Sequence, residues 1–183
     1  ARFRGEISMG SSGRLLVIDR TSRAVVRMFP LTGQPDSVAL SPDGRYGAVV
    51  IENQRNEDLN GGLLPQAPSG ALLVIDFVGG PDAWALRPVD LGPVSAGAAD
   101  GDDLEPEFVD INRRNMAVVS FQENNHLAVV DLRRGRTTSQ FSAGSVDLRL
   151  VDVVEDDLIS FDGALTKRRE PDAVAWVDDD SFS

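Results

Sequence analysis

The feature that most constrains this chain is an internal repeat. Three apolar runs recur, and each ends in an aspartate: Leu15–Asp19, Leu72–Asp76 and Leu127–Asp131. Three segments that open with proline and an acidic residue also recur: Pro35-Asp36, Pro106-Glu107 and Pro171-Asp172. Such self-similarity is typical of repeat architectures, in which each unit buries its faces against its neighbours. The chain is therefore expected to be a row of similar units.

Each unit is expected to contain four short antiparallel strands. Residues 48–51 and 117–121 are rich in β-branched side chains and are bounded by turn formers, which indicates strands. The sequence Ser-Pro-Asp-Gly at 41–44 predicts a tight turn, because proline presets φ and glycine tolerates positive φ. We name the strand positions A to D and expect A at 36–41, 107–112 and 172–177; B at 46–52, 115–122 and a start near 181; C at 14–19, 71–76 and 126–131; and D at 24–31, 84–91 and 136–142. Residues 3–9 are a candidate for a further B strand, and 146–158 is the one stretch with a helical pattern.

These units predict an all-β chain with the architecture of a β-propeller, in which blades of four-stranded antiparallel sheet pack side by side. Residues 1–183 are expected to form a single propeller segment with blades at 1–31 (partial), 36–91, 107–142 and 172–183 (truncated). A Rossmann-type fold is excluded, because no G-x-G-x-x-G precedes a helix and no amphipathic helices separate the strands. A β-sandwich or another all-β fold is the remaining alternative.

The predicted ring is incomplete. Propellers typically have about four to eight blades, so two full and two partial blades make only part of one. The missing blades would come from the rest of a longer chain or from a second copy. In the second case the C-terminal A strand would complete the first blade, and two three-blade chains would pair into a six-blade ring that covers the exposed strand edges.

Several segments resemble known propeller families. Residues 35–44 resemble the repeat of bacterial YVTN-type propellers, although Ala-Val-Val-Ile-Glu-Asn stands here in place of the Tyr-Val-Thr-Asn strand. Residues 105–109, 122–125 and 169–174 look like parts of secreted or surface propeller proteins associated with esterase-like phytase domains. The resemblance implies an extracellular, periplasmic or cell-surface location.

The charge balance bears on possible partners. The chain has 29 acidic and 18 basic residues and a net charge of -11, which argues against a nucleic-acid binder. No apolar stretch approaches the roughly 18 residues of a membrane span. Because the chain contains no cysteine, disulfides, thiol catalysis and zinc–thiolate sites are excluded.

Acidic charge is expected to gather on one rim of the propeller. In up-and-down blades the B–C and D–A connections emerge together, and these are the long ones here, at 54–70, 92–105 and 143–170. Segments 31–36, 52–70, 92–107 and 143–172 on this rim carry a summed charge of -12. Because binding residues concentrate on long loops of a rigid scaffold, this rim is the candidate functional face.

The densest acidic run lies at 100–107, and its five carboxylates are candidate Ca²⁺ ligands: Asp100, Asp102, Asp103, Glu105 and Glu107. Ca²⁺ takes about six to eight oxygen ligands, of which such a turn can supply several. A solvated acidic loop without metal is the alternative. Two B strands reach the same rim, and each ends there in a glutamate–asparagine pair: Glu52 and Asn53, and Glu123 and Asn124. These residues either bind a ligand there or cap the blades with hydrogen bonds.

The single histidine, His126, is the only possible base for a Ser-His-Asp triad, but no G-x-S-x-G motif is present. We include it among the binding candidates and expect an ordinary surface residue on the rim. The preferred function is an extracytoplasmic binding scaffold whose acidic face takes Ca²⁺ and an unidentified ligand or protein partner. The resemblance also implies a calcium-dependent phosphoesterase or an esterase-like hydrolase, and a surface adhesion module is a further alternative.

Overall fold

Two complete four-stranded antiparallel sheets form the body of the protein. The computed structural model describes residues 13–52, 56 and 58–183. One sheet contains, in chain order, β3 (Gln34–Leu40), β4 (Tyr46–Glu52), β5 (Ala71–Asp76) and β6 (Ala85–Pro88). The other contains, again in chain order, β7 (Pro106–Ile111), β8 (Met116–Phe121), β9 (His126–Asp131) and β10 (Arg136–Ser142). Each sheet is a four-stranded meander, so the predicted A to D positions are confirmed for both blades.

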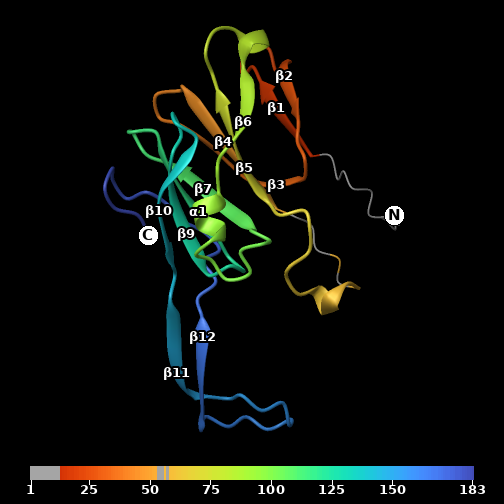
Figure 1. Ribbon diagram of the computed structural model, residues 1–183, viewed down its shortest axis with the longest axis vertical. Helices are drawn as coiled ribbons and strands as arrows, with labels where there is room; N and C mark the ends of the chain where they lie inside the picture. The colour runs from red at the N-terminus through yellow and green to blue at the C-terminus, as the bar shows by residue number, and fades with distance from the viewer. Residues whose placement is uncertain (1–12, 53–55, 57) are drawn as a thin grey trace.

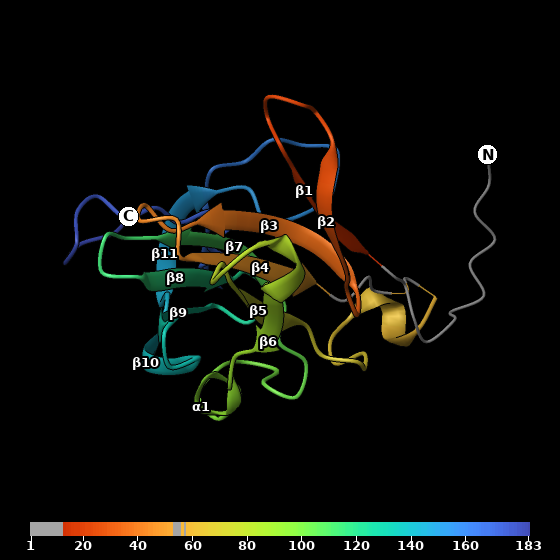
Figure 2. The same cartoon turned by 90° about the horizontal axis from the view of Figure 1, so that it is seen from above.

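The sheets pack face to face, as successive blades of a propeller do (Figure 2). Their B strands read as continuous apolar runs because both of their faces are covered: Val49 lies in one core cluster, and its neighbour Val50 lies in the other. The larger cluster lies between the two complete blades and includes Phe121, which is fully buried. The smaller one lies between the β3–β6 blade and the first sheet, where Phe29 is buried. The fold class is therefore confirmed as an all-β propeller segment whose ring is not closed (Figure 1).

Partial blades flank the two complete ones. The first sheet consists of β1 (Arg14–Ile18) and β2 (Val25–Pro30), which occupy the C and D positions. The candidate B strand at 3–9 lies outside the described residues. At the other end, the A strand predicted at 172–177 is reduced to a bridge between Trp176 and Phe182, next to backbone hydrogen bonds that join Ala175 and Ser183. These contacts form a short hairpin at 175–183.

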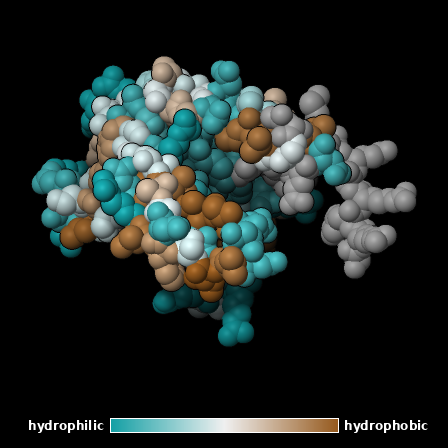
Figure 3. All heavy atoms as spheres, turned by 90° about the horizontal axis from the view of Figure 1, so that it is seen from below, coloured by the Kyte–Doolittle hydropathy of each residue, from teal (hydrophilic) through white to brown (hydrophobic). Residues whose placement is uncertain are grey.

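The helix expected over 146–158 is wrong. The chain there forms a β-hairpin of β11 (Ser145–Val151) and β12 (Gly163–Arg168). Apolar residues at every second position, Val146, Leu148 and Leu150, fit a strand, and Leu148 faces Leu165 across the pair. The hairpin projects from the body (Figure 1), and Figure 3 shows apolar side chains gathered on the side from which it projects.

Helix is confined to short pieces in the part of the chain that the structure describes. These are α1 (Gly92–Ser95) and two 3-10 turns, Asn60–Gly62 and Pro81–Ala83. No helix among the described residues is long and apolar enough to cross a membrane. All three pieces lie in connections between strands, so the strands alone build the scaffold.

Candidate functional site

Three carboxylates converge where the two complete blades meet. Asp36 lies on β3, Glu52 ends β4, and Glu107 lies on β7 of the next blade. One oxygen from each of these side chains lies within 4.8 Å of the others. Because β3 and β4 both pack against β7, the cluster joins side chains from two blades. We call Asp36, Glu52 and Glu107 the inter-blade cluster.

Burial and the crowding of like charges change the acidity of Glu107. Burial, reinforced by the charges of Glu52, Asp36 and Glu123, raises the pKa of Glu107 to about 8. A hydrogen bond from the protonated carboxyl to Asp36 acts in the same direction. Desolvation and neighbouring anions both disfavour an ionised carboxylate. With a pKa of about 8, the carboxyl of Glu107 is therefore mostly protonated at neutral pH.

The carboxylates of the acidic run at 100–107 differ in their exposure to solvent. Asp100 and Asp102 are exposed in the turn, whereas Asp103 and Glu105 are fully buried. The carboxylate of Asp103 accepts a hydrogen bond from the backbone N–H of Gln66, which ties the run to the B–C connection of the preceding blade. Within the described ranges, the carboxylates that meet at metal-binding spacing are those of the inter-blade cluster, so the run contributes Glu107 to it.

Asn124 holds the acidic run in place. Its amide is fully buried, and its Nδ2 donates to the carbonyl oxygens of Ala99, at 2.8 Å, and Asp103, at 3.0 Å. Its Oδ1 accepts a 2.8 Å hydrogen bond from the backbone N–H of Glu105. Asn124 thus fixes the backbone just before Glu107 enters β7. Asn53, the other predicted asparagine, lies outside the described residues.

His126 is not a surface residue, so that expectation is wrong. Only 2% of it is exposed, and its Nε2 contacts Oε1 of Gln140 on the neighbouring strand β10. It begins β9, which is an inner strand of the sheet between β8 and β10, and this position covers the imidazole. The ring therefore serves the packing of the blade and is closed off from the rim surface.

The other predicted rim residues divide between the cluster and its surroundings. Glu52 is a member of the inter-blade cluster, and Glu123 lies in the turn after β8, close enough for its charge to raise the pKa of Glu107 together with burial. Asp36 is a member that our sequence analysis did not select. The sequence feature that marks Asp36 is the proline–acid pair that begins each A strand. Glu107 belongs to the corresponding pair of the next blade.

Comparisons with known proteins identify a family for this chain. The family model of the choice-of-anchor I domain matches residues 6–180. No curated protein sequence matches the chain. Among solved structures, the β-propeller domain of Cps50 (Swd1) from Myceliophteria thermophila is similar, with 13% identity and a TM-score of 0.32 over 71% of this chain and 48% of that one. This chain thus spans about half the length of that propeller domain.

The match to the family model identifies the family of this chain. It covers nearly the whole chain, and it agrees with the predicted cell-surface or extracellular location. The likeness to YVTN-type repeats and to phytase-associated propellers stays a prediction. From its family match, this chain belongs to the choice-of-anchor I domain family.

Proposed function

We propose that the chain is a binding scaffold of a surface-associated protein, in which the inter-blade cluster holds a Ca²⁺ ion. The observation that carries the proposal is the approach of Asp36, Glu52 and Glu107 to within 4.8 Å of one another from two blades. Ca²⁺ prefers carboxylate oxygens and completes its shell with carbonyls and water. Three carboxylates from rigid strands are a suitable core for such a shell.

The electrostatics of the cluster support a cation. Burial and the neighbouring carboxylates raise the pKa of Glu107 to about 8, so the fully ionised cluster is costly without a counter-charge. A bound divalent cation offsets this repulsion and displaces the proton from Glu107. Calcium binding should therefore release protons, and it should strengthen as the pH rises.

A cation at this position would fasten one blade to the next. Asp36 and Glu52 belong to the β3–β6 blade and Glu107 to the β7–β10 blade, so ligation links the two sheets directly. Extracellular calcium modules bind with dissociation constants of about 10⁻⁴–10⁻³ M, which suits a surface location. The cation would thereby fix the neighbouring rim loops for a ligand or partner.

The hydrolase alternative would use the same cluster to bridge a phosphate ester and to activate water. The adhesion alternative would use the rim without any chemistry. Phosphatase and esterase assays with and without chelator, run beside the calcium titration, separate these functions. Calcium-dependent turnover would support the hydrolase, and calcium binding without turnover would support the scaffold.

Calorimetric titration of the chelator-treated chain with Ca²⁺ tests the site. Wild type should bind, and Asp36→Asn and Glu107→Gln should each weaken binding by at least about tenfold, because each removes an anionic ligand. Asp102→Asn is the matched control, since Asp102 is an exposed carboxylate outside the cluster. The absence of binding by wild type, or weakening by Asp102→Asn alone, would overturn the proposal.

A further inference from the structure

The B–C connection of the first complete blade ends in a glycine that lies between the two strand ends carrying Glu52 and Glu107. A Cβ atom at Gly70 would lie 2.5 Å from the carbonyl oxygen of Ile51 and 2.7 Å from Cδ of Pro106. Ile51 directly precedes Glu52 at the end of β4. Pro106 directly precedes Glu107 at the start of β7. Since only glycine allows so close an approach, Gly70 sets the spacing of these two strand ends.

The end of this connection is hydrogen-bonded to the acidic run. The backbone N–H of Gly70 donates to the carbonyl oxygen of Leu104 at 2.7 Å. The backbone N–H of Leu104 donates in return to Oγ of Ser69 at 2.8 Å. Four residues earlier in the connection, the backbone N–H of Gln66 donates to the carboxylate of Asp103. The end of the connection is therefore fixed to the backbone that leads into β7.

Gln66 also organises the rest of the connection. Its Oε1 accepts a 2.8 Å hydrogen bond from the backbone N–H of Asn56, and its Nε2 donates to the carbonyl oxygen of Leu59 at 3.2 Å. Leu59 and Leu63 are 51% and 66% exposed, so the connection presents apolar side chains on the rim. Residues 58–70 extend beyond the ends of the blade strands (Figure 1). Gln66 thus links this rim surface to the acidic run.

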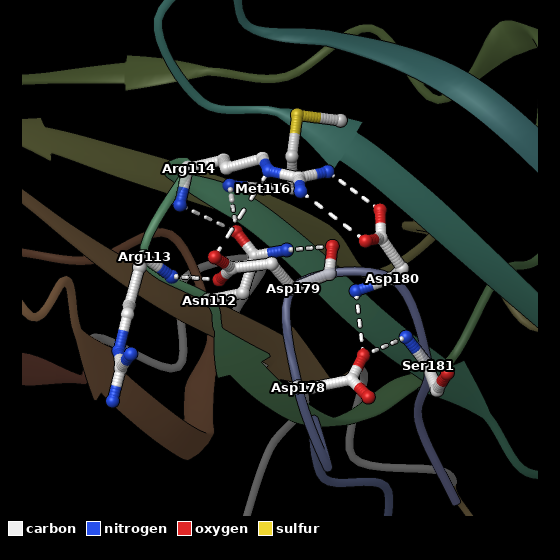
Figure 4. A network of polar contacts seen from close by, with 8 residues as sticks. All are labelled: Asn112, Arg113, Arg114, Met116, Asp178, Asp179, Asp180 and Ser181. Carbon is white, nitrogen blue, oxygen red and sulfur yellow. Dashed lines mark hydrogen bonds and ion pairs between the residues drawn. The ribbon is translucent and has the colours of Figure 1, made fainter.

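Separate contacts hold the opposite ends of the blades together. Nδ2 of Asn115 donates to Oδ2 of Asp43 at 2.8 Å, which joins the A–B turns of the two complete blades. Arg114 in the second of these turns pairs with Asp180 of the C-terminal hairpin (Figure 4). These contacts fix the blades at their turn ends. The spacing at the other end, where the inter-blade cluster lies, is therefore left to Gly70 and the acidic run.

We propose that the B–C connection regulates the cation site: Ser69 and Gly70 position Glu52 and Glu107 for the ion, and the bound ion in turn holds the connection on the acidic run. This inference rests on the Ca²⁺ site of the proposed function. Coupling between two binding equilibria is reciprocal. The factor by which the docked connection strengthens cation binding is therefore also the factor by which the cation stabilises the docked connection. The apolar rim surface of the connection would then depend on the Ca²⁺ concentration.

Calorimetric titration of the chelator-treated chain with Ca²⁺ tests the role of Gly70. Gly70→Ala should weaken binding at least about tenfold, because the added methyl group pushes the ends of β4 and β7 apart. Gly80→Ala is the matched control in the same blade, since a Cβ atom at Gly80 would meet no atom within 4 Å. Its affinity should equal that of wild type. Equal affinities of the two variants would overturn the assigned role of Gly70.

Ser69 offers a test that disturbs the fold less, because this residue is exposed. Ser69→Ala removes the acceptor of the Leu104 N–H and should weaken Ca²⁺ binding by about threefold, the equivalent of one ordinary hydrogen bond. Ser69→Thr keeps the hydroxyl and should restore the wild-type affinity. Wild-type affinity of Ser69→Ala, or no recovery in Ser69→Thr, would contradict a positioning role.

Hydrogen exchange measured by mass spectrometry tests the reverse effect. Saturating Ca²⁺ should slow exchange of the wild-type peptide that contains Gln66 and Gly70 by at least about fivefold, since these amides donate to the acidic run. The same Ca²⁺ concentration should leave this peptide unchanged in Glu107→Gln. The peptide at 152–162, on the projecting hairpin, is the internal control and should not respond in either protein.

The two measurements separate this inference from the proposed cation site. If wild type binds Ca²⁺ and exchange at Gln66 and Gly70 does not change, the coupling is wrong and the cation site stands. If wild type binds no Ca²⁺, both are wrong. Binding together with slower exchange at these amides alone is the result that supports the regulation of the site by the B–C connection.

Discussion

The stability of the chain should depend on pH through Glu107. Burial and the adjacent carboxylates raise the pKa of this group from 4.5 to about 8. Between these values the native state holds a proton that the unfolded state has lost, so the free energy of unfolding falls as the pH rises. Glu107→Gln preserves the size of the side chain and removes this titration. The variant should therefore resist the loss of stability that wild type undergoes between about pH 5 and 8.

The size of the effect follows from the pKa and from the exposure of the group. A rise from 4.5 to about 8 corresponds to about 5 kcal/mol at roughly 1.4 kcal/mol per pH unit. Glu107 is only partly buried, and solvent screening reduces such interactions strongly, so we expect about 1–2 kcal/mol. At pH 9 and in the presence of chelator, Glu107→Gln should be more stable than wild type by this amount. At pH 4 the two proteins should be nearly equal.

Urea denaturation of both proteins at intervals between pH 4 and 9, with chelator present, measures this difference. Asp156→Asn serves as the control, because Asp156 is an exposed acid of the projecting hairpin. It should follow the wild-type curve. Parallel curves for wild type and Glu107→Gln would refute the view that like charges are crowded in the inter-blade cluster. Added Ca²⁺ should flatten the wild-type curve, because the cation replaces the proton.

Two further predictions concern the packing that holds the cluster. Asn124→Ala should lower the free energy of unfolding by about 2–3 kcal/mol, because it leaves buried polar groups of the acidic run without their partner, and urea denaturation measures this loss. Phe121→Ala should lower the free energy of unfolding by about 3–5 kcal/mol in the same assay, because Phe121 is fully buried. Phe161 is exposed on the projecting hairpin, so Phe161→Ala should change this free energy by less than about 0.5 kcal/mol. Equal losses for the two phenylalanine variants would contradict the assignment of the core.

The blade strands could be predicted because their signals are local. Apolar runs such as Leu72–Asp76 and the turn at 41–44 determine strand and connection over a few residues, and their recurrence reinforces each assignment. The hairpin at 145–168 was missed although Val146, Leu148 and Leu150 alternate with polar residues, because this alternation covers only one short strand. Its strands lie on the surface, so the pattern of burial that distinguishes a strand from a helix is weak there.

The site was predicted only at the level of the rim. Glu52 and Glu107 were both candidates, but they lie 55 positions apart in the sequence, and only the packing of β4 on β7 brings them together. The burial of His126 likewise depends on the packing inside the blade, because its ring contacts Gln140 on the neighbouring strand β10. Charge patterns thus indicate which face is acidic, and the contact between blades determines which carboxylates meet.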